Sequence, residues 1–152
     1  MGRSEMDNWI PIDESTLVCE MSNKNKAQTQ LPMNIWIDEN QTYIKGRHSK
    51  RVKFQLNHAN RINLNSFGSM DLDGNLHPDN LDIGELSEDD IKQLRNFVIN
   101  NKYALEHVAD NDIWLDEIWP SIIKGGETAS FEEIQKLNLK VDELIDYNNS
   151  LD

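Results

Sequence analysis

Alternating apolar and polar positions dominate the chain between residues 33 and 76. Met33, Ile35 and Ile37 occupy every second position, and this spacing is typical of strands that bury one face. Asp73-Gly74, with a leucine on either side, indicates a tight hairpin turn. The pattern predicts an antiparallel sheet of four or five strands, at residues 33–37, 42–45, 52–56 and 61–64 and around the turn at 70–76.

After Gly84 the apolar residues follow the spacing of a helical turn, about 3.6 residues. Ser87 is followed by three acidic residues, which is close to a capping box, because the serine accepts from a backbone N–H and the acids favour the positive end of the helix. This predicts one long helix over 88–108. Ser130 begins a second capping box, which predicts a helix over 131–147.

The segment between these helices, residues 112–124, has apolar side chains on two faces and is interrupted by Pro120. A proline lacks a backbone donor and disfavours helical geometry in the residue before it. We therefore expect two short pieces or a kink near Trp119. Gly125-Gly126 then ends the segment, as is typical of a helix C-terminus.

These patterns together predict an α+β fold, in which helices cover one face of an antiparallel sheet. Residues 22–30 are polar throughout and have no periodicity, so they are expected to form an exposed connection. We therefore divide the chain into an N-terminal extension over 1–30 and a single α+β domain over 31–152. The first five residues of the extension resemble a cloning remnant.

Length and composition restrict the class of protein. A chain of 152 residues fits one ordinary domain. It contains no apolar run near the roughly 20 residues that span a bilayer and no secretory signal. Cys19 is the only cysteine, which excludes an intramolecular disulfide framework and a multi-cysteine metal site. We expect a cytoplasmic protein that does not contact membranes.

Charge is concentrated in the second half of the chain. Residues 71–152 contain six Lys/Arg and twenty Asp/Glu, a net charge of −14. This half includes a block of two tryptophans and four acids, and Trp often dominates the energy of protein interfaces while acids attract a basic partner. The block predicts a partner-binding ridge, with packing of both indoles into the core as the alternative. Its residues are Asp110, Asp112, Trp114, Asp116, Glu117 and Trp119.

The one concentrated group of positive charges lies at residues 45–53. If it occupies a turn and the solvent face of the next strand, its cations would converge and could bind a nucleic-acid backbone. The alternatives are an internal clamp onto the acidic helices and an ordinary solvated strand. The cations concerned are Arg47, Lys50, Arg51 and Lys53.

Catalytic and metal-binding motifs give little support to an enzyme. Asp79, Asp90 and Lys92 match the letter pattern of a metal-dependent nuclease, but Asp90 lies in a helix start rather than on a core strand. The aspartates from Asp71 onward resemble a calcium loop whose glycine is misplaced. The four histidines, at 48, 58, 77 and 107, have no tight spacing. We expect no cofactor and no resident metal.

Two segments resemble a known family. Gly84-Glu85-Leu86-Ser87, followed by a helix that carries the segment 100–106 (Asn-Asn-Lys-Tyr-Ala-Leu-Glu), is similar to small uncharacterised bacterial domains. The genes of these domains lie beside toxin–antitoxin and other mobile-element genes. The resemblance covers about residues 33–110. It implies an accessory protein that acts on a partner, and it implies no particular activity.

The sequence therefore predicts a non-enzymatic cytosolic interaction protein. Its acidic half would bind a basic protein, as an inhibitor or an antitoxin-like accessory does. One alternative is a nucleic-acid-binding module that uses residues 45–53, and the other is a metal-dependent nuclease that uses Asp79, Asp90 and Lys92.

Overall fold

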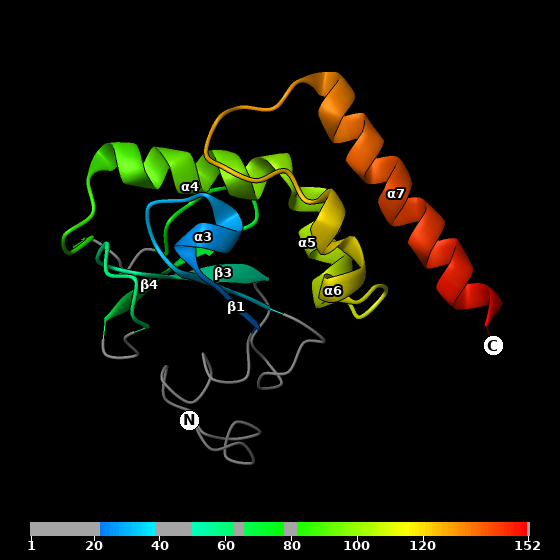
Figure 1. Cartoon of the computed structure of the whole chain (residues 1–152), viewed down its shortest axis with the longest axis horizontal. Helices are drawn as coiled ribbons and strands as arrows, with labels where there is room; N and C mark the ends of the chain where they lie inside the picture. The colour runs from blue at the N-terminus through cyan, green and yellow to red at the C-terminus, as the bar shows by residue number, and fades with distance from the viewer. Residues whose placement is uncertain (1–21, 39–49, 63–65, 78–81, 152) are drawn as a thin grey trace, which may run out of the picture.

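The computed structural model describes residues 22–38, 50–62, 66–77 and 82–151. They form a four-stranded antiparallel sheet followed by helices (Figure 1), which confirms the α+β prediction. No helix in these ranges is both long enough and apolar enough to cross a membrane.

The sheet has the strand order β1-β2-β3-β4, so each strand pairs with its neighbour in the chain. In register, Ile35 of β2 faces Phe54 of β3, and Val52 of β3 faces Met70 of β4. All four side chains are completely buried, as expected for alternate positions on one inward face. The strands are β1 (Ser22–Lys24), β2 (Ile35–Ile37), β3 (Arg51–Gln55) and β4 (Phe67–Asp71).

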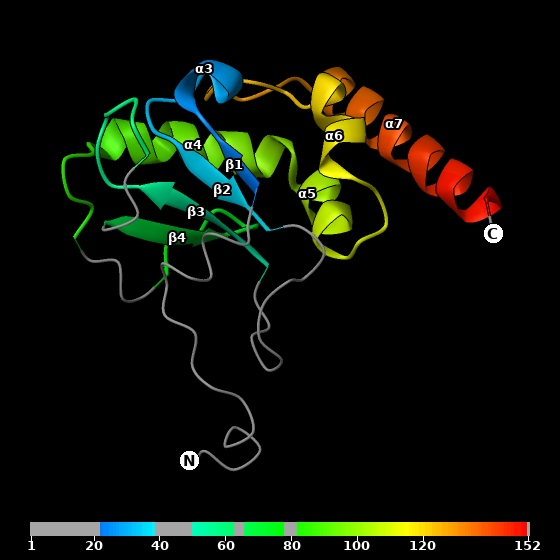
Figure 2. The same ribbon diagram turned by 60° about the horizontal axis from the view of Figure 1, so that its bottom comes forward.

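The helix α4 (Glu88–Asn100) runs along one face of the sheet (Figure 2). Its Leu94, Phe97 and Val98 are fully buried and belong to the same hydrophobic core as the inward strand residues. The helices that follow are α5 (Lys102–Ala109), α6 (Leu115–Ile118), the 3₁₀ turn η1 (Trp119–Ser121) and α7 (Phe131–Ser150). The two short pieces expected around Pro120 are confirmed as α6 and η1.

The polar segment 22–30 is not the expected exposed connection. It contains the edge strand β1 and the short helix α3 (Lys26–Thr29). Asn25 and Gln28 form a reciprocal capping box, and the Thr29 side chain is fully buried. Periodicity missed this segment because β1 is a polar edge strand that pairs with β2, and because polar side chains, not an apolar stripe, cap the short helix α3.

The described part of the strand predicted at 61–64 is not a strand. Residues 57–62 form no strand; instead, Gln55 Nε2 donates to Arg61 O at 3.0 Å. The strand predicted at 42–45 lies outside the described residues. The turn at Asp73-Gly74 is confirmed, since Asp71 N–H donates to Asn75 O and Met70 forms an antiparallel bridge with Leu76.

The prediction of a single helix over 88–108 is wrong, because the helix is interrupted at Asn101, between α4 and α5. Asn101 Nδ2 donates to Phe97 O and Ile123 O, while its Oδ1 accepts from Ile123 N–H. The backbone N–H of Asn101 still donates to Phe97 O, and its fully buried side chain binds the distant segment at Ile123. The apolar stripe continues across the break and so gives no sign of it.

The last helix begins at Phe131, as its capping box predicts, and continues to Ser150. It packs against α5 and α6 and lies to one side of the sheet in both views (Figures 1 and 2), rather than over the sheet face as expected. Of its twenty residues only Leu137 and Val141 are buried. Most of the surface of α7 is therefore exposed.

Candidate functional site

The predicted partner-binding ridge is centred on Trp114, which directly precedes α6. The apolar neighbours Ile113, Leu115 and Ile118 are buried, whereas 55% of Trp114 is exposed. The segment is thus anchored in the core on both sides of one exposed indole. We refer to Asp110, Asp112, Trp114, Asp116 and Glu117 as the Trp114 surface.

One hydrogen bond at the start of α6 and two from α7 hold the Trp114 surface in place. Glu117 Oε1 accepts from Trp114 N–H at 3.0 Å. Asn148 of α7 donates its side-chain amide to Asp112 O at 3.3 Å and to Glu117 Oε1 at 3.4 Å. Glu117 therefore has a structural role in holding α6. A surface fixed in this way loses little conformational entropy when it binds.

The acids of the Trp114 surface are only partly compensated. Lys50 Nζ lies 2.7 Å from Asp110 Oδ2, and His107 Nδ1 lies 2.6 Å from Asp112 Oδ2. Asp116 is exposed and makes no hydrogen bond or ion pair with any residue that the structure describes. Asp116 is consequently the acid most available to a cation on a partner.

Trp119, the second predicted anchor, is placed differently from Trp114. It is partly buried and packs against the core. The ammonium groups of Lys24 and Lys124 lie 4.6 and 4.8 Å from its ring centroid, within the range of cation–π attraction. Trp119 therefore joins β1 to the chain beyond η1 and does not belong to the Trp114 surface.

The described residues of the basic cluster do not converge on a solvent face. Arg51 and Lys53 are buried, with 8% and 4% of their surface exposed, and Lys53 Nζ lies 5.6 Å from the Phe67 ring centroid. Lys50 pairs with Asp110, as an internal clamp onto the acidic helices would. Arg47 lies outside the described residues.

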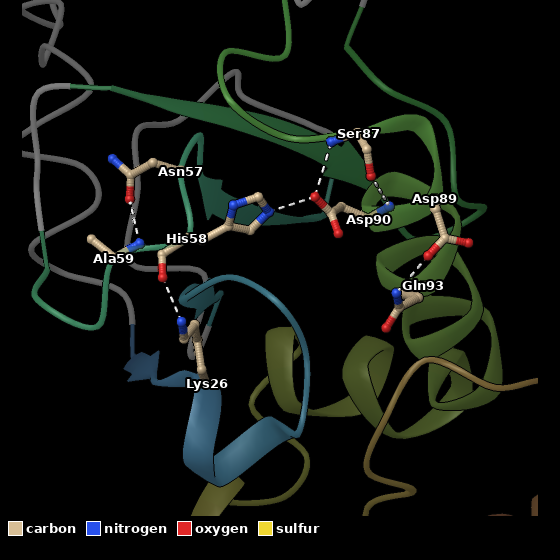
Figure 3. A network of polar contacts seen from close by, with 8 residues as sticks. All are labelled: Lys26, Asn57, His58, Ala59, Ser87, Asp89, Asp90 and Gln93. Carbon is tan, nitrogen blue, oxygen red and sulfur yellow. Dashed lines mark hydrogen bonds and ion pairs between the residues drawn. The ribbon is translucent and has the colours of Figure 1, made fainter.

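A polar network at the start of α4 extends the predicted capping box at Ser87 to a histidine that the sequence did not indicate (Figure 3). His58 Nε2 lies 2.6 Å from Asp90 Oδ2, and the same oxygen accepts from Ser87 N–H at 2.9 Å. Lys26 Nζ donates to the His58 carbonyl oxygen. His58 and Asp90 are 32 residues apart, so no local spacing could have indicated this pair.

The environment of Asp90 has opposing effects on its acidity. Burial alone would raise the pKa of the carboxyl, but the hydrogen bonds from Ser87 and His58 and the charge of His58 outweigh burial and lower the pKa below 3.8. Asp90 is therefore ionised at neutral pH while only 12% of its side chain is exposed. The His58 side chain is about half exposed, which leaves an imidazole oriented by a carboxylate at the surface.

The two described residues of the nuclease hypothesis, Asp90 and Lys92, do not face a common site. Asp79 lies outside the described residues, and Asp90 is engaged by Ser87 and His58. Lys92, two positions along the helix, faces a different direction from Asp90. No cluster of three or more His, Cys, Asp or Glu side chains suited to a metal is present in the described part of the chain.

No protein-family model, curated protein or solved structure matches this chain. The resemblance to small bacterial domains over residues 33–110 therefore stays a prediction.

Proposed function

We propose that this protein is a non-enzymatic interaction module that binds a basic protein through the Trp114 surface. The observation that carries the proposal is an indole more than half exposed on a segment that is anchored in the core on both sides. An inhibitor or an antitoxin-like accessory of the cytoplasm would act by such binding alone.

Burial of Trp114 would supply the main attraction. A tryptophan carries a large apolar area and is enriched among the residues that dominate interface energies. In the free protein much of this area faces water, and its removal from water on binding is favourable. The hydrogen bonds of Glu117 and Asn148 hold the backbone beneath it in place before a partner arrives.

Charge supports a basic partner rather than an acidic one. The half of the chain that contains the Trp114 surface carries a net charge of −14, and Asp116 is exposed beside the indole. A field of this sign raises the rate at which a basic surface is encountered and repels nucleic-acid backbone.

Nucleic-acid binding by residues 45–53 is the less favoured alternative, because Arg51 and Lys53 are buried and Lys50 is paired with Asp110. A metal-dependent nuclease has no supporting geometry among the described residues.

Affinity capture by the full chain from its native organism tests the proposal, at low and at physiological salt and with nuclease treatment. We expect the wild-type chain to retain a basic protein after nuclease treatment, and Trp114→Ala to lose it. The control is Ile99→Ala, which removes a comparably exposed apolar side chain from α4 and should retain the protein. Recovery of nucleic acid alone, of no partner, or of equal partner with Trp114→Ala would overturn the proposal.

A further inference from the structure

The C-terminal end of α7 adjoins the segment that carries Trp114. Asn148 of α7 donates to Asp112 O and to Glu117 Oε1, and the same Glu117 oxygen accepts from Trp114 N–H. One carboxylate oxygen thus links the backbone of Trp114 to α7, and α6 as a whole packs against α7 (Figure 1). The Trp114 surface and the last turns of α7 are therefore neighbours in the fold.

Two large apolar side chains are exposed at this end of α7. Tyr147 is 59% exposed and Leu151 is 65% exposed. Leu151 caps the helix in helical geometry, so these two side chains, four residues apart, lie on the same side of α7. Apolar side chains gathered in one exposed region, with polar residues around them, are typical of an interaction site. We refer to Asp146, Tyr147 and Leu151 as the α7 end.

The charges near the α7 end are unfavourable in the free protein. No Lys or Arg follows Lys140, whereas residues 141–152 include four acids. Two of them, Asp142 and Asp146, are four residues apart, and like charges at this spacing destabilise a helix. Tyr103 Oη donates to Asp142 Oδ1 at 2.5 Å, but Asp146 makes no hydrogen bond or ion pair with any described residue. A cation supplied from outside the chain would relieve this repulsion.

We propose that the partner of this protein presents a basic amphipathic helix, which packs against Trp114 and the α7 end together. This inference rests on the proposed function, because it specifies the partner of the same site. Apolar side chains of the partner helix would cover Trp114, Tyr147 and Leu151. Its lysines or arginines would lie beside Asp116 and Asp146, the two exposed acids without described partners.

The local structure favours a helix over an extended segment as the occupant. Residues 110–118 and α7 are helical or in turns, so this part of the molecule offers no strand edge to which a partner strand could be added. Side chains four residues apart form a ridge on a helix, and a second helix packs its own ridges beside such a ridge. Tyr147 and Leu151 have this spacing. A helix with apolar and basic faces side by side would meet both the ridge and the acids.

Capture of the native partner by full-length variants separates this inference from the proposed function. Tyr147→Ala and Leu151→Ala should each lower retention of the partner about fivefold, because each removes apolar surface from the contact. The matched control is Leu139→Ala, which alters a leucine that is 57% exposed elsewhere on α7 and should retain the partner fully. Loss of the partner by Trp114→Ala, with full retention by Tyr147→Ala and Leu151→Ala, would overturn this inference alone. Retention by Trp114→Ala would overturn the proposed function as well.

A synthetic peptide tests the chemistry of the partner. The probe is a helix of about 18 residues, or five turns, built from leucine and lysine with the leucines on one face. In titrations of the full chain followed by NMR, we expect saturable shift changes at Trp114, Tyr147 and Leu151. A peptide of the same composition with strictly alternating leucine and lysine has no apolar helical face, and it should bind about tenfold more weakly.

Two charge variants complete the peptide titration. Asp146→Asn should weaken binding of the helical peptide about threefold at low salt, and this effect should vanish at high salt. The control is Glu132→Gln, which neutralises an exposed acid at the opposite end of α7 and should bind as the wild type does. No binding of the helical peptide, equal affinity for the two peptides, or equal effects of the two charge variants would overturn the inference.

Discussion

Asp90 shows how one side chain stabilises several parts of this fold. Its carboxylate accepts from Ser87 N–H, its backbone N–H donates to Ser87 Oγ, and its Oδ2 meets His58 Nε2. The helix start and the segment after β3 are thereby joined at a single carboxylate. The capping half of this arrangement could be predicted from the sequence Ser87-Glu88-Asp89-Asp90, whereas the partner His58 could not.

The lowered pKa of Asp90 predicts a pH dependence of stability. A carboxyl whose pKa is lower in the fold than in the unfolded chain stabilises the fold above its unfolded value, 3.8, and this stabilisation is lost as the pH falls through the folded value. Asp90→Asn should therefore be less stable than the wild type at pH 6, and its stability should decline less between pH 5 and pH 3.

Urea unfolding at several pH values measures this effect. The control is Asp116→Asn, an exposed acid without described contacts, which should keep the pH dependence of the wild type. A decline as steep in Asp90→Asn as in the wild type would show that Asp90 does not cause the acid sensitivity.

Trp114 and Asp116 should affect different rates of partner binding. Trp114→Ala removes apolar surface that is covered only in the complex, so it should raise the dissociation rate by tenfold or more and change the association rate little. Asp116→Asn should lower the association rate a few-fold at low salt, and this effect should vanish at high salt. Surface plasmon resonance with the captured partner measures both rates, and the opposite assignment would contradict the proposed roles.

Asn100 and Asn101 join the helical elements to the connection that precedes α7. Asn100 Nδ2 donates to Glu127 O, and its Oδ1 accepts from Ala129 N–H. Asn101 makes three further bonds, two of them to Ile123. The connection between η1 and α7 is therefore held by two adjacent amides at the break between α4 and α5.

Asn101→Ala should destabilise the protein by about 2 kcal/mol, because it leaves the backbone N–H and carbonyl oxygen of Ile123 without the partners that this buried side chain provides. Asn149→Ala, at an exposed position of α7, should change stability by less than about 0.5 kcal/mol. Chemical denaturation of both variants gives the comparison. Equal stability of the two would mean that the amide bonds of Asn101 are not needed for the helix break.

Prediction of the elements from sequence succeeded where the signal is local. Capping serines locate the starts of α4 and α7, and alternation locates β2 and β3. The break at Asn101 was missed because its cause is a bond to Ile123, 22 residues away. Likewise, composition indicates Trp114 and Trp119 equally, whereas in the fold Trp119 packs against the core and beneath the ammonium groups of Lys24 and Lys124.

Across the whole molecule, the helices contribute unequally to the core. Six of the thirteen residues of α4 are buried, against two of the twenty of α7, and α7 lies beside α5 and α6, away from the sheet (Figure 1). Elements with few buried apolar side chains open at a lower free energy than the global unfolding. The Asn148 bonds to the Trp114 surface depend on α7 being in place.

Hydrogen exchange should therefore show lower protection in α7 than in α4. In the native state, we expect the amides of α7 beyond Val141 to exchange by local opening, and those around Phe97 to exchange only on global unfolding. Mass spectrometry of peptic fragments can measure this difference. Equal protection in α4 and α7 would mean that α7 unfolds only together with the sheet.

Photocross-linking in the native organism tests the central claim most directly. A photoreactive residue at position 116, beside the exposed indole, should cross-link the full chain to a basic protein. The same residue at position 99, an exposed site on α4, should not capture that protein. Absence of a protein cross-link from position 116, or capture of the same proteins from both positions, would contradict the assignment of the Trp114 surface as the binding site.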